Sequence, residues 1–224
     1  MYHIVFSALV ALVALTGCRG PQIQEVDFRK FFAGNEGCIV FLSPQTNRTI
    51  VFQREKAMER QSPCSTFKVV STLLGLQAGV VTPDTRLGYD GTRYNYEAWN
   101  HDVTLEEAFR ASCVWYYKKM VARLDRQYVV DALKRLNYGN CDLSAWNREG
   151  PNGFWLMSSL KISPLEQTAV LSRIFGGQSG FAPEQVRMVR EFMPRTRGRA
   201  ASIDIRRSGR LAVRVRPGLR NGTK

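Results

Sequence analysis

The chain has 224 residues, 44% hydrophobic and 23% charged, which suits one globular protein with a sizeable core and excludes a wholly disordered chain. Its formal net charge of +13 would suit a nucleic-acid or membrane-surface binder. Residues 195–224, however, hold nine Arg and one Lys against one acid, Asp204 (+9), and residues 1–194 hold the other 22 basic and 18 acidic residues (+4). Because this basic tail has no interleaved aromatic residues and no recognisable module, we expect no nucleic-acid partner.

The N-terminus has the features of an export signal. Residues 4–15 are an apolar run that is short for a membrane span but suitable for the core of a signal peptide, although no Lys or Arg precedes it. Leu15-Thr16-Gly17-Cys18 follows and resembles the bacterial lipobox, whose cysteine is lipidated. A buried apolar strand is the alternative. We expect a signal peptide over residues 1–18, Cys18 as a candidate lipidation site, and a chain that is periplasmic or lipid-anchored to a bacterial membrane.

The first predicted elements are strands, and a helix follows them. Two β-rich runs, residues 38–42 and 49–52, flank Ser-Pro-Gln-Thr-Asn and predict a β-hairpin. From Thr66 onward apolar residues recur at helical spacing, and Gly79 is placed to end that helix. Residues 80–103 form a polar and aromatic connection.

Helix signals dominate the middle of the chain. Thr104 and Glu107 form a capping box, and Ser163-Pro164-Leu165-Glu166 is a second start signal with Pro at the first helical position. With strands at the beginning and in the tail, these signals predict an α+β protein. Beyond the helix that starts at Thr104, further helices are expected over residues 116–124, 126–136, 164–175 and 183–192.

Four cysteines remain after Cys18: Cys38, Cys64, Cys113 and Cys141. Their number is even, but they form no Cys-x-x-Cys pair and no ligand cluster, so we predict no metal site. For Cys64 and Cys113 we expect the role of a small buried side chain.

Ser65 and Lys68 are the first candidates for chemistry. At the start of a helix they lie one turn apart on the same face, so the amine can accept the proton of the hydroxyl. Partial burial against neighbours such as Phe67 and Val114 would lower the lysine pKa, as a general base requires. The backbone amide of Ser65, at a helix N-terminus, is suited to stabilise an oxyanion. Ser-x-x-Lys alone is a weak pattern, because it also occurs as a solvated pair.

Three more segments make the pattern specific. Ser112 stands in "ASCVWYYKKM", Tyr138-Gly139-Asn140 in "LNYGNCDLS", and Trp155 in "GFWLMSSLKISPLEQ". Taken singly, these are explained by a helix-interior hydroxyl, a helix stop and a core aromatic residue. Together with "PCSTFK" they resemble the class D, or oxacillinase-type, serine β-lactamases over about residues 35–192.

The resemblance implies a role for each of these residues. Ser65 would open the β-lactam ring and form an acyl-enzyme, and Lys68 would be the base, modified to N6-carboxylysine by carbon dioxide, with no other cofactor. Val114 would keep the pocket dry, Trp155 would donate its indole hydrogen to the carbamate, and Ser112 would relay a proton to the leaving nitrogen. A structural motif lining the site is matched by Tyr138, Gly139 and Asn140.

The resemblance also implies a fold, and the sequence departs from it near the end. The family fold is the α+β serine β-lactamase and penicillin-binding transpeptidase type, a helical lobe beside an antiparallel sheet. This sequence has no Lys-Thr-Gly motif, and Arg207-Ser208-Gly209 is the one candidate relic. We therefore expect an incomplete domain over residues 19–193, an incomplete sheet, and a divergent tail over 194–224 produced by truncation or a frameshift. Loss of one oxyanion donor would cost about 10²–10³ in rate.

Two functional readings stay open from the sequence. The first is a β-lactam hydrolase acting on β-lactam antibiotics; the alternative is a penicillin-binding sensor or transpeptidase-like domain that is acylated without turnover. Sensors of this kind normally follow a large membrane protease segment. Neither the β-lactam spectrum nor the oligomeric state follows from the sequence.

Overall fold

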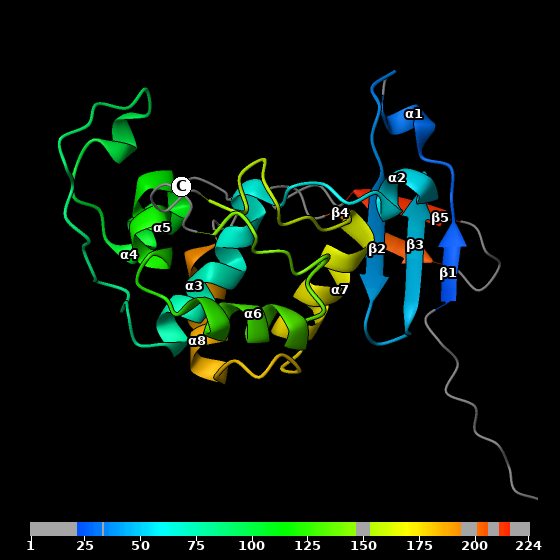
Figure 1. The fold of residues 1–224 in the computed structure, drawn as a ribbon. Helices are drawn as coiled ribbons and strands as arrows, with labels where there is room; N and C mark the ends of the chain where they lie inside the picture. Colours follow the sequence, from blue (N-terminus) through cyan, green and yellow to red (C-terminus); the bar gives the residue numbers. More distant parts are fainter. Residues whose placement is uncertain (1–21, 33, 147–152, 194–200, 206–210, 216–224) are drawn as a thin grey trace, which may run out of the picture. The chain divides into compact units, whose positions relative to one another are not determined.

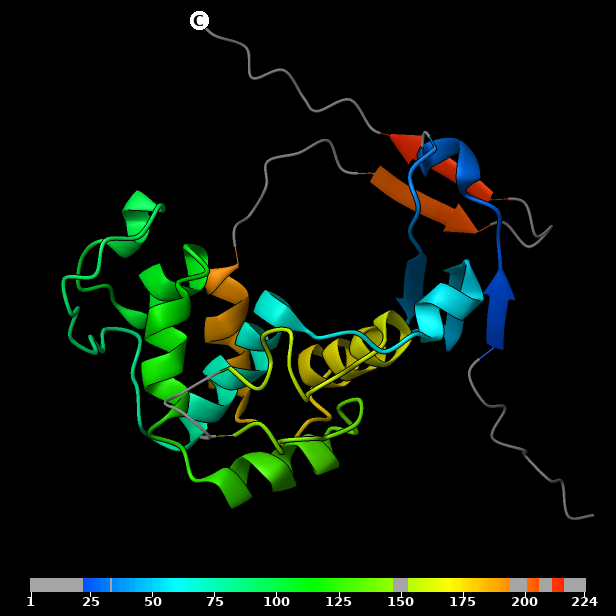
Figure 2. The same cartoon turned by 45° about the horizontal axis from the view of Figure 1, so that its top comes forward.

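The computed structural model describes most of the chain (Figures 1 and 2). It forms two compact units. The first comprises residues up to Phe67 together with 122–181, and the second comprises residues 68–121 together with those from Ala182 onward. The predicted leader and the Arg207-Ser208-Gly209 segment lie outside the described residues. Those residues are 22–32, 34–146 and 153–193, with the backbone of 201–205 and 211–215.

A three-stranded sheet organises the start of the first unit. Strands β2 (Ile39–Ser43) and β3 (Arg48–Phe52) form the predicted antiparallel hairpin, with Ile39 opposite Phe52. Strand β1 (Gln22–Glu25) pairs in parallel with β3 and gives the order β1-β3-β2 (Figure 1). The prediction of strands and helices in an α+β fold is confirmed, but this sheet is mixed and not wholly antiparallel. Strand β1 was not predicted because Gln-Ile-Gln-Glu is polar and mostly exposed.

Helices pack beside this sheet within the first unit. Helix α7 (Pro164–Phe175) contacts β2 and the short helix α2 (Arg54–Met58). Beyond α2 the chain forms the 3-10 turn η1 (Cys64–Phe67). The remaining helices of the unit are α1 (Arg29–Phe32) and α6 (Arg126–Arg135).

The second unit is mainly helical. Helix α3 (Lys68–Gln77) packs against α5 (Val114–Val121) and α8 (Pro183–Phe192), and α4 (Leu105–Arg110) packs against the same two helices. At Gly75 a Cβ would lie 2.8 Å from Met120 Sδ, so α3 and α5 approach closely there. The unit also contains the 3-10 turn η2 (Glu97–Trp99) and an antiparallel hairpin of β4 (Ala201–Ile205) and β5 (Leu211–Val215), which confirms strands in the tail.

Both predicted capping boxes are present. In α4 the Thr104 hydroxyl accepts from Glu107 N (3.2 Å), and the Glu107 carboxylate accepts from Thr104 N (2.7 Å). In α7 the corresponding distances between Ser163 and Glu166 are 3.2 and 2.9 Å. Helix α5 begins two residues earlier than predicted and ends at Val121, three residues before the predicted end. The helices α6, α7 and α8 lie where they were expected.

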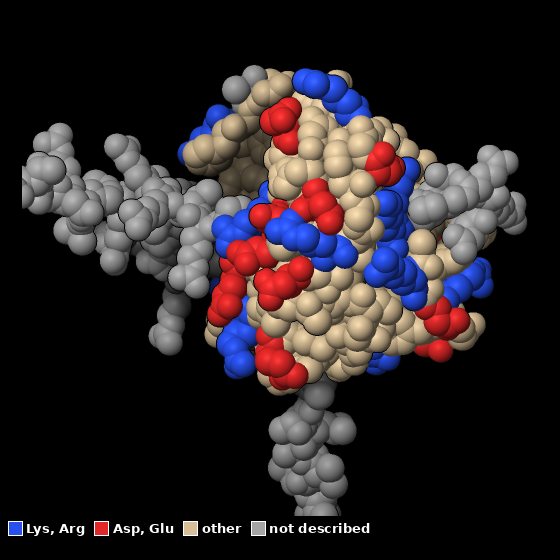
Figure 3. Space-filling view, turned by 90° about the vertical axis from the view of Figure 1, so that its left-hand side faces the viewer, with Lys and Arg blue, Asp and Glu red and all other residues tan. Residues whose placement is uncertain are grey.

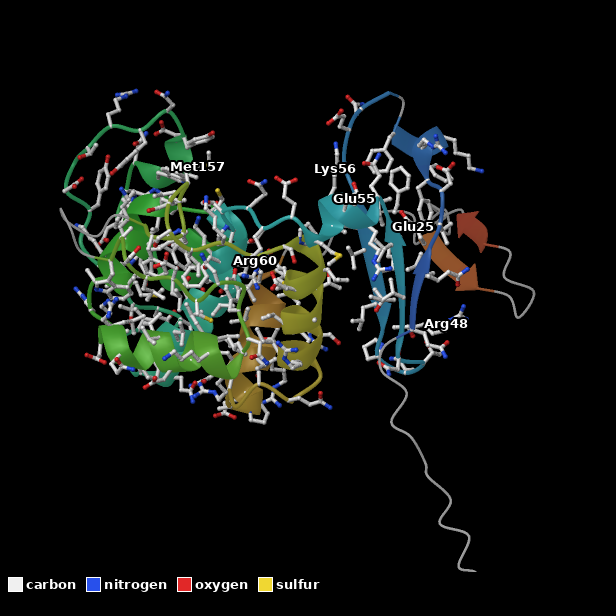
Figure 4. All side chains as sticks on the ribbon, turned by 45° about the vertical axis from the view of Figure 1, so that its right-hand side comes forward. Glu25, Arg48, Glu55, Lys56, Arg60 and Met157 are labelled. Atoms are coloured by element: carbon white, nitrogen blue, oxygen red, sulfur yellow. The ribbon has the colours of Figure 1, made fainter. Side chains whose placement is uncertain are left out.

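Glu166 also joins α7 to the segment that precedes η1. Arg60, labelled in Figure 4, donates from Nε to both carboxylate oxygens of Glu166 at 3.0 Å, and Nη2 donates to the same carboxylate. This pair lowers the pKa of the Glu166 carboxyl, against the opposing effect of its burial. The helix start and the segment leading to η1 are thus held by one carboxylate.

The described surface is mixed in charge. Figure 3 shows Lys and Arg side chains interspersed with Asp and Glu over the face that it presents. In the second unit Arg110 pairs with Glu106 (2.7 Å), and Arg86 pairs with Glu107 (3.6 Å). This agrees with the small net charge of residues 1–194. Along the described residues, no helix combines the length and the apolarity needed to cross a membrane.

Candidate active site

Ser65 lies on the exposed turn η1, at the end of the first unit. Cys64 has a left-handed backbone (φ +47°), and its N–H donates to the Trp155 carbonyl at 2.9 Å. The Thr66 hydroxyl donates to the Pro63 carbonyl at 2.6 Å. These bonds fix the turn that carries Ser65 and tie it to the Trp155 segment, so two of the predicted site segments meet here.

An aromatic cluster supports this turn. The Phe67 ring is buried, with ring centroids 5.8 Å from Trp155, 5.6 Å from Tyr138 and 5.5 Å from Phe154. The side chain of Trp155 is itself only 2% exposed. Trp155 is therefore a core aromatic residue, as the alternative interpretation had it. Its packing against Phe67 also places its segment against the turn that carries Ser65.

Asn140 fastens the end of α6 to the chain that leads into α7. Its N–H donates to the Lys161 carbonyl, and its Oδ1 accepts from Lys161 N, each at 2.9 Å. Its Nδ2 also donates to the Ser159 carbonyl at 2.9 Å. Gly139 has φ +55°, and a Cβ there would lie 1.9 Å from the Lys161 oxygen. The predicted Tyr138-Gly139-Asn140 motif is thus a backbone clamp, which a simple helix stop would not provide.

The phenol of Tyr138 is deeply buried beside η1. Burial raises the pKa of this phenol, and the Thr66 side chain partly offsets the effect. Within the described residues the hydroxyl meets no partner at hydrogen-bond geometry. The Thr66 side chain is its polar neighbour, so the buried phenol packs against the turn that carries Ser65.

Lys68 opens α3 in the second unit and is 3% exposed. Its Nζ lies 5.3 Å from the centroid of the buried Tyr117 ring. The Tyr117 hydroxyl shares a 2.6 Å hydrogen bond with Thr72, and burial raises the pKa of this phenol. Burial raises the pKa of Cys113, while the charge of Lys68 acts to lower it. Because burial disfavours the charged ammonium, this environment suits an amine that acts as a base.

Ser112 and Val114 flank the start of α5 in the same unit. Ser112 is half-buried with φ +54°, and its N–H donates to the Phe109 carbonyl at 3.1 Å. It lies in the turn between α4 and α5, so the alternative of a helix-interior hydroxyl is wrong. Val114 is the first residue of α5 and is half-buried. Cys113 between them is fully buried, as expected, whereas Cys64 is only half-buried.

Left-handed backbone recurs in the candidate segments. It occurs at Cys64, Ser112 and Gly139, and also at Met157 (φ +52°), two residues after Trp155. The Met157 side chain is 84% exposed and projects from its loop in Figure 4. Such conformations cost free energy for residues other than glycine and concentrate at functional sites. No local pattern pointed to Met157, because exposure of a methionine depends on the tertiary fold.

The fold and these segments define a class of protein. Residues 37–205 match the family model of the penicillin binding protein transpeptidase domain, and the chain belongs to that family. The match reaches into β4, beyond the residue 192 at which the sequence resemblance was expected to end.

Within that family the chain is a member of the class D serine β-lactamases. It is similar to the probable β-lactamase YbxI of Bacillus subtilis, with 36% identity over 79% of this chain and 65% of YbxI. The crystal structure of a class D β-lactamase from Bacillus subtilis matches with a TM-score of 0.72 and 34% identity, over 80% of this chain and 74% of that chain. These matches confirm the predicted fold class and family.

A protein of another kind is also similar. The regulatory protein BlaR1 of Bacillus licheniformis is 33% identical over 77% of this chain, which corresponds to 28% of BlaR1. The chain thus spans just under two thirds of YbxI and about a quarter of BlaR1.

Proposed function

We propose that the protein is a serine hydrolase of β-lactams that works through an acyl-enzyme on Ser65. The observation that carries the proposal is an exposed serine followed three residues later by a lysine that is 3% exposed, at the start of a helix. A hydroxyl open to substrate and an amine removed from water are the two states that nucleophile and base require. The family membership supplies the substrate class.

In the proposed mechanism each polar residue has one role in moving a proton. Lys68 removes the proton of the Ser65 hydroxyl as its oxygen attacks the lactam carbonyl. Collapse of the tetrahedral intermediate breaks the carbon–nitrogen bond, and Ser112 relays the proton that Lys68 took to the leaving nitrogen, which returns both residues to their starting protonation states. The exposed backbone turn at Ser65 supplies an N–H for the oxyanion, as acyl-transfer sites require. Water then hydrolyses the ester and releases the opened product.

The family resemblance also implies a carbamate on Lys68, formed with carbon dioxide. Only an uncharged amine reacts with carbon dioxide, and the burial of Lys68 fits that requirement. When bound, this group supplies a stronger base for deacylation. We propose that Val114 excludes water from it and that Trp155 donates its indole hydrogen to it.

Similarity to BlaR1 favours a second candidate, a sensor that is acylated at the same serine without turnover. The two candidates share Ser65 and Lys68 and differ only in deacylation. The 224 residues contain no Lys-Thr-Gly, the motif that would supply a cation and a hydroxyl for the substrate carboxylate. A chain that is not acylated at all is therefore the third outcome.

Intact-protein mass spectrometry separates these candidates. The chain is mixed with benzylpenicillin in bicarbonate buffer, and its mass is followed with time. For the hydrolase we expect an adduct on Ser65 that appears and decays, with release of the hydrolysed drug. An adduct that persists supports the sensor, and no adduct contradicts both.

Two variants serve as controls. Ser65→Ala removes the nucleophile and should never gain the adduct mass. Lys68→Met keeps the nucleophile and should slow acylation by about 10²–10⁴. Circular dichroism establishes that both variants are folded, and an adduct on the Ser65→Ala chain would refute the assignment of Ser65.

We further propose that the protein is exported and anchored through a lipid on Cys18. The proposal is supported by the apolar run at residues 4–15 and by the lipobox-like Leu15-Thr16-Gly17-Cys18. Expressed in a bacterium, the chain should partition into detergent extracts of the membrane fraction, and Cys18→Ala should abolish this. Equal partitioning of the two chains would contradict lipidation.

A further inference from the structure

A cavity of about 610 Å³ lies within the first unit, beside the turn that carries Ser65 but not lined by the residues assigned to acyl transfer. Its wall is formed by the two residues before β2, by α2, by the segment that follows α2 as far as Thr66 in η1, and by α7 with Ile162 before it, and all of these belong to one unit. Neither Ser65 nor Trp155 lines it. A volume of this size accommodates a small organic molecule.

The cavity is lined by both apolar and polar residues. The apolar residues include Pro63, Ile162, Pro164 and Leu171, and the charged ones are Lys56 and Glu59. Sites for small ligands usually combine such an apolar surface with a few placed polar groups. The ligand is therefore expected to have an apolar body and at least one polar group.

Lys56 offers the polar contact that a ligand can use. It projects from α2 in Figure 4, and its side chain is 38% exposed. Its Nζ pairs with Glu36 at 2.5 Å, but Glu36 is 88% exposed, and such a surface pair contributes little stability. A ligand carboxylate can replace Glu36 at small cost, because Glu36 stays solvated when it is released.

The charges around the wall favour an anion over a cation. Lys161 Nζ donates to the hydroxyl of the lining residue Ser62 at 3.0 Å and adds a second positive charge. The one lining carboxylate, Glu59, already accepts a hydrogen bond from the Gln61 amide. An anion at Lys56 thus meets the ammonium group, displaces the exposed Glu36 carboxylate, and faces a Glu59 carboxylate that is already engaged.

We propose that this cavity binds an organic anion with a flat apolar body, an aryl carboxylate in chemical class, with its carboxylate on Lys56 and its ring against Ile162 and Leu171. The bound molecule is separate from the substrate of Ser65.

Cys38 provides a direct reporter, because its half-buried thiol lines the cavity. Burial raises the pKa of this thiol, against the opposing effect of Lys56. In the experiment the full chain is alkylated slowly with iodoacetamide at several concentrations of 2-naphthoate, and each cysteine is quantified by peptide mass spectrometry. We expect Cys38 to be protected with a Kd of about 0.1–1 mM, as a ligand of this size allows. Protection should weaken as salt is added.

Two substitutions test the contacts. Lys56→Met removes the cation while keeping the length of the side chain, and we expect it to raise the Kd about tenfold. Glu59→Gln removes the carboxylate and should leave the Kd unchanged or lower it. Thermal melts without ligand establish that both variants keep the fold.

Cys64 and Cys141 provide internal references. Cys64 is next to Ser65, so protection of Cys64 without protection of Cys38 would mean that 2-naphthoate binds beside the nucleophile, and it would overturn the proposal. No protection of Cys38, or equal affinity in Lys56→Met, would also overturn it. None of these readouts depends on β-lactam turnover.

Discussion

Gly139→Ala tests the clamp between α6 and α7. A left-handed conformation costs an L-residue about 1–2 kcal/mol. The new Cβ would also lie 1.9 Å from the Lys161 carbonyl oxygen, so the backbone must shift. That shift breaks the hydrogen bond from Asn140 N–H to the Lys161 carbonyl and weakens the one from Lys161 N–H to Asn140 Oδ1. Each loss costs about 1 kcal/mol. The free energy of unfolding should therefore fall by about 3–4 kcal/mol.

Urea unfolding followed by tryptophan fluorescence measures this loss. The matched control is Gly177→Ala, because Gly177 also has a positive φ (+76°) in the same unit, but a methyl group there would meet no atom within 4 Å. The control should lose only about 1–2 kcal/mol, since the backbone preference alone changes. Equal losses in the two variants would refute the clash and the clamp derived from it.

Substitutions at three other contacts give further predictions. Lys68→Met should slow acylation by about 10²–10⁴ while the chain stays folded, because an apolar side chain of similar length fills the same buried position; loss of the cooperative unfolding transition would contradict this. Glu166→Gln should cost about 1 kcal/mol or less at pH 7. Arg60 lowers the pKa of Glu166 in the folded state, so the stabilisation is complete above the unfolded pKa near 4.5 and is lost as the pH falls through the folded pKa; a cost that persists in acid would exclude the ion pair as its source. Thr72→Val should cost about 1–3 kcal/mol by leaving the buried Tyr117 hydroxyl unpaired, and adding Tyr117→Phe should recover part of that loss in urea titrations.

Local signals in the sequence were sufficient for much of the secondary structure. The boxes at Thr104 and Ser163 predicted helix starts correctly, because a capping box is made by residues only three apart. Helix α2 was missed, since its five residues carry no cap and follow Gln53 in a left-handed conformation. The start of α5 was placed too late because the turn at Ser112 has no signal in its residue types.

The sequence named candidate site residues but not the contacts that they make. "PCSTFK" and "WLMSSLKISPLEQ" made Ser65, Lys68 and Trp155 candidates, because these segments resemble the class D family. The bonds from Asn140 to Ser159 and Lys161 span about twenty residues, so no local pattern reveals them. Likewise, the cavity at Lys56 arises from segments distant in the sequence, and its existence depends on how they pack.

Strand β2 bears on how the protein behaves in concentrated solution. It lies at one edge of the described sheet, and its sequence, Ile-Val-Phe-Leu-Ser, has no charge and no proline. Natural edge strands usually carry charged residues or proline, because an open edge offers backbone groups for pairing with another chain. Self-association through β2 would be second order in protein concentration. Phe41→Lys would then slow the loss of soluble protein, because pairing of two β2 strands would bring like charges together.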